Sequence, residues 1–108
     1  MTRLVFSPSA LQDIERLAEF LMESDPVAAS ATADVLTGGL KILKHHPLVG
    51  RPAELGYREL LISRGRTGYV ALYKYKVERD AAIILAIRHQ REGGFLFDNG
   101  GLSPSTPS

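Results

Sequence analysis

Residues 57–95 read YRELLISRGRTGYVALYKYKVERDAAIILAIRHQREGGF, and this stretch decides the fold. Apolar and aromatic residues fill three runs, at 60–63, 69–77 and 81–89, and short segments rich in Gly, Arg, Glu and Asp separate these runs. Such runs between turn residues predict three consecutive antiparallel strands. The third run is almost entirely Ile, Leu and Ala, which is typical of a central strand buried on both faces.

The predicted meander is also the most basic part of the chain. Residues 57–91 contain eight Lys or Arg against three Asp or Glu, a net charge of +5, whereas the whole chain carries only +1. A charge cluster of this kind is often no more than a solvated surface, but it also suits an acidic or anionic partner. The basic residues that we expect to form a partner or nucleic-acid surface are Arg51, Arg58, Arg64, Arg66, Lys74, Lys76, Arg88 and Arg91.

The chain before the meander begins with a short strand and a helix. Residues 3–6 are β-prone, and a strand this short is stable only if it pairs with the meander. Ser7 and Pro8 are the residue types preferred at a helix N-cap and at the first helical position. Apolar residues then recur three and four apart as far as residue 21, which predicts an amphipathic helix.

A second helix is predicted directly after the first. Asp25 and Pro26 repeat the start signal, and the helix is expected to end at His46, because a residue that precedes proline disfavours helical geometry. Gly38 and Gly39 lie inside this helix, where each glycine costs about 1 kcal/mol relative to alanine. We expect a close contact with the first helix or the sheet to require them.

These elements predict a two-layer α+β domain with the order β-α-α-β-β-β. The N-terminal helical hairpin packs on one face of a mainly antiparallel sheet, because its apolar stripe has no other surface to cover. Residues 47–56 are expected to be a loop. The domain is expected to span residues 1–95, and residues 96–108, rich in Gly, Ser and Pro, are expected to form a flexible tail.

The composition excludes several classes of protein and site. The 108 residues include no cysteine, so the chain forms no disulfide and offers no thiolate ligand. We expect neither a metal site nor a cofactor, since no cluster of ligating residues and no phosphate-binding glycine motif occurs. No segment is as apolar as a membrane span or a signal peptide, so we expect a cytoplasmic protein without membrane contact.

His89 is the titratable residue with the clearest catalytic potential. It ends the third predicted strand among arginines, where a histidine suits general acid or base catalysis of RNA cleavage, with arginines stabilising the phosphate charge. The simpler interpretation is a histidine that packs at the end of the sheet. Strict alternation places His89 on the same face as Ile87 and Ile83 and places Arg88 on the opposite face, unless the strand contains a bulge.

Three tyrosines of the second predicted strand admit two interpretations. Tyr69, Tyr73 and Tyr75 share one face of that strand. Tyrosines on a sheet surface can stack on RNA bases, and a free-standing RNA-binding module is therefore one hypothesis for the protein. Tyrosines on a half-buried strand are more often packing residues with a solvated hydroxyl, and we favour this second interpretation.

Several short motifs, taken in order, carry a resemblance to a known family. They are the opening strand followed by Ser7-Pro8-Ser9-Ala10, the helical hairpin, Pro47-x-x-Gly50-Arg51-Pro52, Arg58, Gly68-Tyr69-x-x-x-Tyr73, and Ile87-x-His89-x-x-Glu92 with Arg91. In this combination, over about residues 3–95, the chain resembles the RelE/ParE superfamily of bacterial type II toxins. The resemblance implies a growth-arresting toxin of a plasmid-stabilising type, bound in a hetero-oligomer by an antitoxin with an acidic, amphipathic segment.

The resemblance implies two alternative targets. ParE-like members inhibit DNA gyrase and have a long helical hairpin, as this chain does, so we favour gyrase inhibition without catalysis. RelE-like members cleave messenger RNA on the ribosome without a metal, and His89, Arg91 and Arg58 would then be the catalytic residues. Val70 stands where such ribonucleases have an arginine, and Phe95 and Phe97 stand where they have a tyrosine, which favours the ParE-like alternative.

Overall fold

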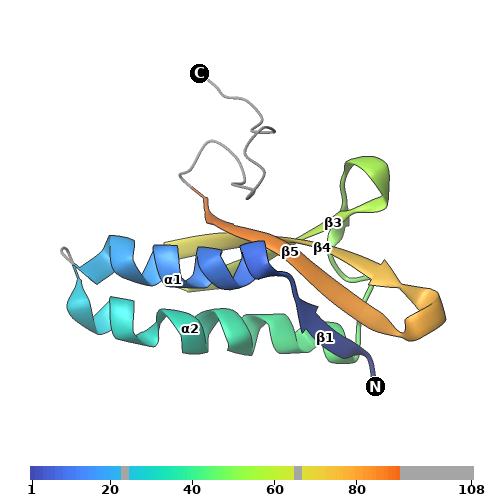
Figure 1. Cartoon of the computed structure of the whole chain (residues 1–108), viewed down its shortest axis with the longest axis horizontal. Helices are drawn as coiled ribbons and strands as arrows, with labels where there is room; N and C mark the ends of the chain where they lie inside the picture. Colours follow the sequence, from blue (N-terminus) through green and yellow to red (C-terminus); the bar gives the residue numbers. More distant parts are fainter. Residues whose placement is uncertain (23–24, 65–66, 91–108) are drawn as a thin grey trace.

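The computed structural model shows a helical hairpin packed on one face of a five-stranded sheet (Figure 1). It describes residues 1–22, 25–64 and 67–90. The predicted two-layer α+β architecture is therefore confirmed. The expected tail at 96–108 lies outside the described residues. Within the described ranges, no helix is both long enough and apolar enough to cross a membrane.

Two helices form the hairpin, and both begin where the sequence predicts. Helix α1 spans Pro8–Met22 and helix α2 spans Pro26–Leu40. The Ser7 hydroxyl accepts a hydrogen bond from the Ala10 N–H at 3.1 Å, which is the contact of an N-cap. The predicted end of the second helix at His46 is wrong, because the α-helix stops at Leu40 and a 3₁₀ helix, Lys41–Lys44, continues the chain. Two consecutive glycines weaken the α-helix just before this point.

The sheet contains one parallel pair and is otherwise antiparallel. The strands, in the order in which they lie across the sheet, are β1 (Arg3–Phe6), β5 (Ala81–His89), β4 (Thr67–Lys76), β3 (Arg58–Arg64) and β2 (Arg51–Pro52). Strand β2 lies inside the segment predicted as a loop. The run at 81–89 forms β5, an inner strand between β1 and β4 with no exposed residue, as predicted for a buried central strand. Strand β1 runs parallel to β5 and covers only its first half, as far as Ile84.

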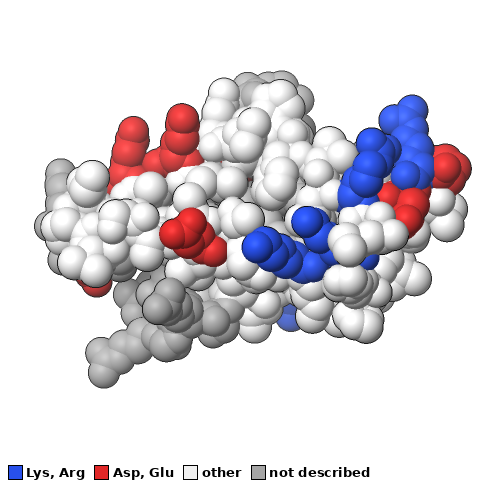
Figure 2. All heavy atoms as spheres, turned by 90° about the horizontal axis from the view of Figure 1, so that it is seen from below, with Lys and Arg blue, Asp and Glu red and all other residues white. Residues whose placement is uncertain are grey.

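Acidic and basic side chains are unevenly distributed over one face of the molecule. Figure 2 shows acidic side chains alone toward the end where the helical hairpin turns, basic side chains near the centre, and a mixed cluster of basic and acidic side chains at the other end. Glu15, Glu19 and Asp34 are exposed on the helices, and Arg3 and Lys41 are exposed near the N-terminus. Basic residues outside the meander therefore contribute to the basic part of the surface.

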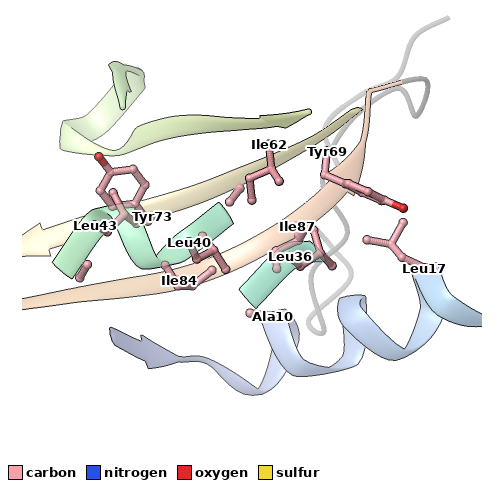
Figure 3. Packing of buried hydrophobic residues seen from close by; sticks show 12 residues of the cluster. Ala10, Leu17, Leu36, Leu40, Leu43, Ile62, Tyr69, Tyr73, Ile84 and Ile87 are labelled. Carbon is pink, nitrogen blue, oxygen red and sulfur yellow. The ribbon is translucent and has the colours of Figure 1, made fainter. Parts of the chain in front are cut away.

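The core lies between the hairpin and the sheet. Figure 3 shows Leu36 and Leu40 of α2 and Leu17 of α1 packed toward Tyr69, Tyr73 and other sheet residues. Tyr69 and Tyr73 are only 3% and 0% exposed. Their rings therefore belong to the core, as the packing interpretation predicted, and are not available to stack on RNA bases.

A bulge in β5 changes which residues of this strand face the helices. Leu72 pairs with Ala86 but the next residue, Tyr73, pairs with Ile84, so Leu85 has no opposite residue on β4. Ile84 and Ile87 consequently face the core together although they are three positions apart. Strict alternation therefore fails before His89, which shares its face with Ile84 and Ile87 rather than with Ile83.

The two glycines of α2 stand in different surroundings. A Cβ atom at Gly39 would lie 2.6 Å from the Ile62 Cγ2 atom of β3, whereas a Cβ atom at Gly38 would meet nothing within 4 Å. The predicted close contact with the sheet is therefore confirmed for Gly39 only. Gly38 is exposed and no contact explains it.

These surroundings predict opposite effects for two neighbouring substitutions. Gly39→Ala should lower the free energy of unfolding by about 1–2 kcal/mol, because overpacking against Ile62 outweighs the gain in helix propensity. Gly38→Ala should raise it by about 0.5–1 kcal/mol through helix propensity alone. Urea unfolding of both variants measures the difference, and equal changes would contradict the close packing of α2 on β3.

Candidate functional site

The basic residues of the meander lie on two opposite faces of the sheet. Arg58 is directly opposite Tyr73, a core residue, and therefore lies on the face that the helices cover. Lys74 and Lys76 alternate with Tyr73 and lie on the other, open face. The net charge of +5 counted along the sequence is thus not presented by a single surface.

Arg58 is engaged within the protein. Its Nη1 atom donates hydrogen bonds to the carbonyl oxygens of Leu48 and Gly50, at 3.1 and 2.7 Å. The Tyr73 hydroxyl holds the same segment, since it accepts a hydrogen bond from the Gly50 N–H at 2.9 Å and donates one to the Pro47 carbonyl at 2.8 Å. Arg58 and Tyr73 together fix the connection from the helices to the sheet. We call this set of hydrogen bonds to the segment 47–50 the Tyr73 clasp.

The electrostatics of this clasp follow from its burial. Burial raises the pKa of the Tyr73 hydroxyl, and the Gly50 N–H and the Arg58 guanidinium oppose that rise. The hydroxyl therefore stays protonated through the physiological range and remains a donor to Pro47. The clasp does not depend on pH under these conditions.

The open face carries basic side chains with contacts of their own. Arg51 of β2 forms an ion pair with Glu59 of β3, with 3.0 Å between Nη2 and Oε1, although the Arg51 side chain is 72% exposed. The Lys74 ammonium lies 5.4 Å from the ring centroid of Tyr57, a cation–π contact. Exposed pairs of this kind contribute little to stability, so these side chains can exchange their contacts for those of a partner.

The remaining predicted surface residues lie toward the other end of the strands. Arg88 is opposite Val70 on the face of the sheet that points away from the helices, and its Nη1 atom donates to the carbonyl oxygens of His89 and Gln90, at 3.3 and 3.4 Å. The backbone of Arg64 ends β3. Arg66 and Arg91 lie outside the described residues.

His89 packs at the end of the core. It is opposite Tyr69 on β4, and the two rings make an edge-on contact with centroids 5.5 Å apart and an angle of 81° between their planes. His89 therefore lies on the helix-covered face of the sheet, and Arg88, as predicted, lies on the opposite face.

The structure does not bring the predicted catalytic residues His89 and Arg58 together. Their partners on β4, Tyr69 and Tyr73, are four residues apart along one strand. At roughly 3.3 Å per residue this corresponds to about 13 Å between the two positions. A base and a phosphate clamp must both touch the reacting group, so these two residues cannot serve one phosphodiester in this arrangement.

Two polar side chains of α1, Asp13 and Arg16, complete the edge of β5. Asp13 is only 4% exposed and its Oδ2 atom accepts a hydrogen bond from the Ile87 N–H at 2.8 Å. The Arg16 Nη2 atom donates to the Ile87 carbonyl at 3.3 Å and to Asp13 Oδ1 at 3.3 Å. Asp13 follows Ala10 and precedes Leu17 at helical spacing, which is the signal that could have placed it on the buried face.

A second polar network joins the N-terminus to the turn between β4 and β5. The Thr2 hydroxyl donates to Asp80 Oδ1 at 2.6 Å, and the Tyr75 hydroxyl donates to the same atom at 2.9 Å. The hydrogen bond from Thr2, and next that from Tyr75, lower the pKa of Asp80. The hydrogen bond to Asp80 raises the pKa of Tyr75. At neutral pH the Asp80 carboxylate therefore stays charged and the Tyr75 phenol stays neutral, because the hydrogen bonds favour these two forms.

Within the described ranges, no group of three or more His, Cys, Asp or Glu side chains is arranged to hold a metal ion.

Comparison with known proteins gives a consistent result. A family model described as the ParE toxin of the type II toxin-antitoxin system parDE matches residues 4–93. Toxin RelE3 of Caulobacter vibrioides is 34% identical over 92 residues, which cover 85% of this chain and 98% of that protein. The chain thus matches a ParE family and a protein with a RelE name.

Solved structures show the same fold. A chain of the chromosomal ParDE system from P. aeruginosa superimposes with a TM-score of 0.69 at 22% identity, covering 82% of this chain and 96% of that chain. A chain of the RelBE2 toxin-antitoxin complex from Mycobacterium tuberculosis superimposes with a TM-score of 0.56 at 26% identity, covering 82% and 98%. A chain of the intact E. coli RelBE complex gives 0.58 at 15% identity, covering 85% and 100%.

Proposed function

Because the chain belongs to the ParE toxin family of type II toxin-antitoxin systems, within the RelE/ParE superfamily, we propose that it arrests bacterial growth by inhibiting DNA gyrase. An antitoxin holds it inactive until the antitoxin is lost. This proposal includes action in the cytoplasm, where gyrase works, and a toxin-antitoxin hetero-oligomer as the resting state. The neighbouring structures named as ParDE and RelBE systems support the antitoxin partner.

The separation of Arg58 from His89 is the observation that supports gyrase inhibition over RNA cleavage. RNA cleavage through the 2′-hydroxyl needs a base, an acid and a charge stabiliser around one phosphate. Among the described residues, Arg58 is bound to the Leu48 and Gly50 carbonyls and His89 packs on Tyr69. A protein that blocks its target by binding requires no such arrangement.

Ribosome-dependent cleavage of messenger RNA is the second candidate. The relative named RelE3 and the RelBE structures favour it, since RelE-like toxins resemble small ribonucleases. In this mode His89 would act with arginines at the end of β5, including Arg91, which lies outside the described residues. A substitution at His89 separates the two candidates.

We expect the purified protein to inhibit DNA supercoiling by gyrase in a reaction without ribosomes, and to leave messenger RNA intact on translating ribosomes. His89→Ala should change gyrase inhibition by less than about twofold, because His89 lies on the helix-covered face of the sheet, against Tyr69. Under the ribonuclease alternative the same substitution should lower cleavage by about 100-fold or more. Supercoiling and primer-extension assays measure the two activities.

His45→Ala is the matched control, because His45 is an exposed histidine just after the helices and far in sequence from β5. Thermal unfolding of both variants verifies that the fold is retained. Ribosome-dependent cleavage by the unmodified protein that is lost in His89→Ala and kept in His45→Ala would overturn gyrase as the target.

A further inference from the structure

The outer face of α1 carries apolar side chains that packing within the domain does not explain. The helix buries Ala10, Asp13 and Leu17, which recur at helical spacing. Leu11 and Met22 nevertheless stay 53% and 57% exposed. At about 100° per residue, positions 11, 15, 19 and 22 fall within an arc of about 80°, away from the buried side of the helix. We call this set the α1 stripe: Leu11, Glu15, Glu19 and Met22.

The α1 stripe has apolar ends and an acidic centre. Leu11 and Met22 stand about 16 Å apart along the helix axis, and Glu15 and Glu19 lie one turn apart between them. Within the described part of the chain neither glutamate forms an ion pair, whereas Arg16 pairs with Asp13. Like charges one turn apart slightly destabilise a helix, so helix stability does not explain these two glutamates.

The same end of the hairpin exposes further groups of both kinds. Phe20 lies before the turn of the hairpin and Val27 after it, and these side chains are 70% and 79% exposed. Asp34 of α2 is exposed as well. Figure 2 shows that acidic side chains alone occupy the surface toward this end. Exposed apolar side chains grouped with polar ones mark sites of protein–protein contact.

The charge of the α1 stripe restricts what can cover it. Glu15 and Glu19 repel nucleic acid and acidic protein segments. A second copy of the chain, paired through the same surface about a two-fold axis, would place these glutamates opposite their own counterparts. The complementary surface is therefore a basic protein surface that also offers apolar contacts.

We propose that the α1 stripe docks on a positively charged surface of DNA gyrase, an inference that rests on the proposed inhibition of this enzyme. Gyrase binds DNA, and proteins hold DNA phosphates with Lys and Arg side chains, so this target carries basic surface. Glu15 and Glu19 meet those basic side chains. Leu11 and Met22 anchor the two ends of the helix face in apolar contacts, which is a common way of binding one face of a helix.

Supercoiling by gyrase, titrated with the full chain, tests this docking. Glu15→Lys with Glu19→Lys should raise the half-inhibitory concentration by about tenfold or more, because the reversed charges repel a basic surface. Glu15→Gln with Glu19→Gln should raise it by about threefold, since the attraction is lost without repulsion. Leu11→Gln with Met22→Gln should raise it by about tenfold through loss of the apolar anchors.

Two matched controls make the comparison decisive. Glu54→Lys with Glu78→Lys reverses the same number of charges at exposed positions outside the helices. Leu61→Gln with Val77→Gln replaces two exposed apolar side chains, also outside the helices. Both controls should change the half-inhibitory concentration by less than about twofold. Thermal unfolding verifies that each variant is folded, and the charge variants and the apolar variant test the α1 stripe independently of each other.

Inhibition by the unmodified protein that neither the charge variants nor the apolar variant of α1 alters would overturn the docking and leave the proposed function intact. An equal loss in the matched controls would overturn it too. Stronger inhibition after charge reversal would show that the surface facing α1 is acidic, which also contradicts the proposal. Failure of the unmodified protein to inhibit gyrase would instead reject the proposed function and this docking together.

Discussion

Replacing Asp13 by alanine is expected to lower the free energy of unfolding by about 2–4 kcal/mol. The substitution leaves the Ile87 N–H buried without its carboxylate acceptor, and an unsatisfied buried donor costs about 1–3 kcal/mol in addition to the lost bond. It also removes the charge that positions Arg16 against the Ile87 carbonyl. Urea unfolding measures the loss, and growth arrest on expression should weaken as the folded fraction falls.

Two companion variants isolate the cause of this effect. Asp13→Asn keeps an oxygen that can accept from Ile87 but removes the charge, so it should cost about 1–2 kcal/mol. Glu15→Ala, an exposed acid on the same helix, should change stability by less than about 0.5 kcal/mol. A loss at Asp13 no larger than the loss at Glu15 would show that α1 does not support the edge of β5.

Gly50→Ala is expected to be about as damaging, at about 3 kcal/mol or more. An added Cβ atom would lie 2.6 Å from the Tyr73 Cε1 atom, 2.7 Å from its hydroxyl oxygen and 2.8 Å from the Glu59 carbonyl oxygen. The backbone of β3 and a fully buried ring cannot move aside cheaply, so overpacking adds to the loss of the Gly50–Tyr73 hydrogen bond. Thermal unfolding of the variant measures this cost.

Gly68→Ala is the informative control for Gly50→Ala. A Cβ atom at Gly68 would also collide with a neighbour, but this neighbour is the end of the exposed Gln90 side chain, which can rotate into solvent. We therefore expect a loss of less than about 1 kcal/mol at Gly68. If both alanine variants lost the same stability, the rigidity of the Tyr73 clasp would not be the cause.

The strands and helices that the sequence predicted well are those with long, uniform patterns. The run at 81–89 matches β5 at both ends, and Ser7 with Pro8 marks the start of α1 correctly. Strand β2 was missed because its two residues show no periodicity. A bulge in this strand was left open, but it could not be placed at Leu85, because a run composed of Ile, Leu and Ala looks the same on either face.

The candidate site was harder to predict, because the sequence gives the number of charged side chains but does not show to which face of the sheet each one points. Arg58 shares its strand face with Leu60 and Ile62, and this alternation was available in the sequence as a sign that Arg58 faces the helices. No local pattern, however, could bring Arg3 beside Lys41 and Lys44. That arrangement depends on the pairing of β1 with a strand almost eighty residues later.

The parallel pairing of β1 with β5 also has a kinetic consequence. The Thr2–Asp80 hydrogen bond joins residues 78 positions apart, whereas the contacts within the helical hairpin are local. Local contacts tend to form early and contacts between distant segments late, so we expect the helical hairpin and the β3–β5 meander to form before β1 joins the sheet. The first strand has no partner until synthesis has reached β5. We therefore expect this toxin to become competent only after β5 has been synthesised, and an antitoxin to be needed from that moment.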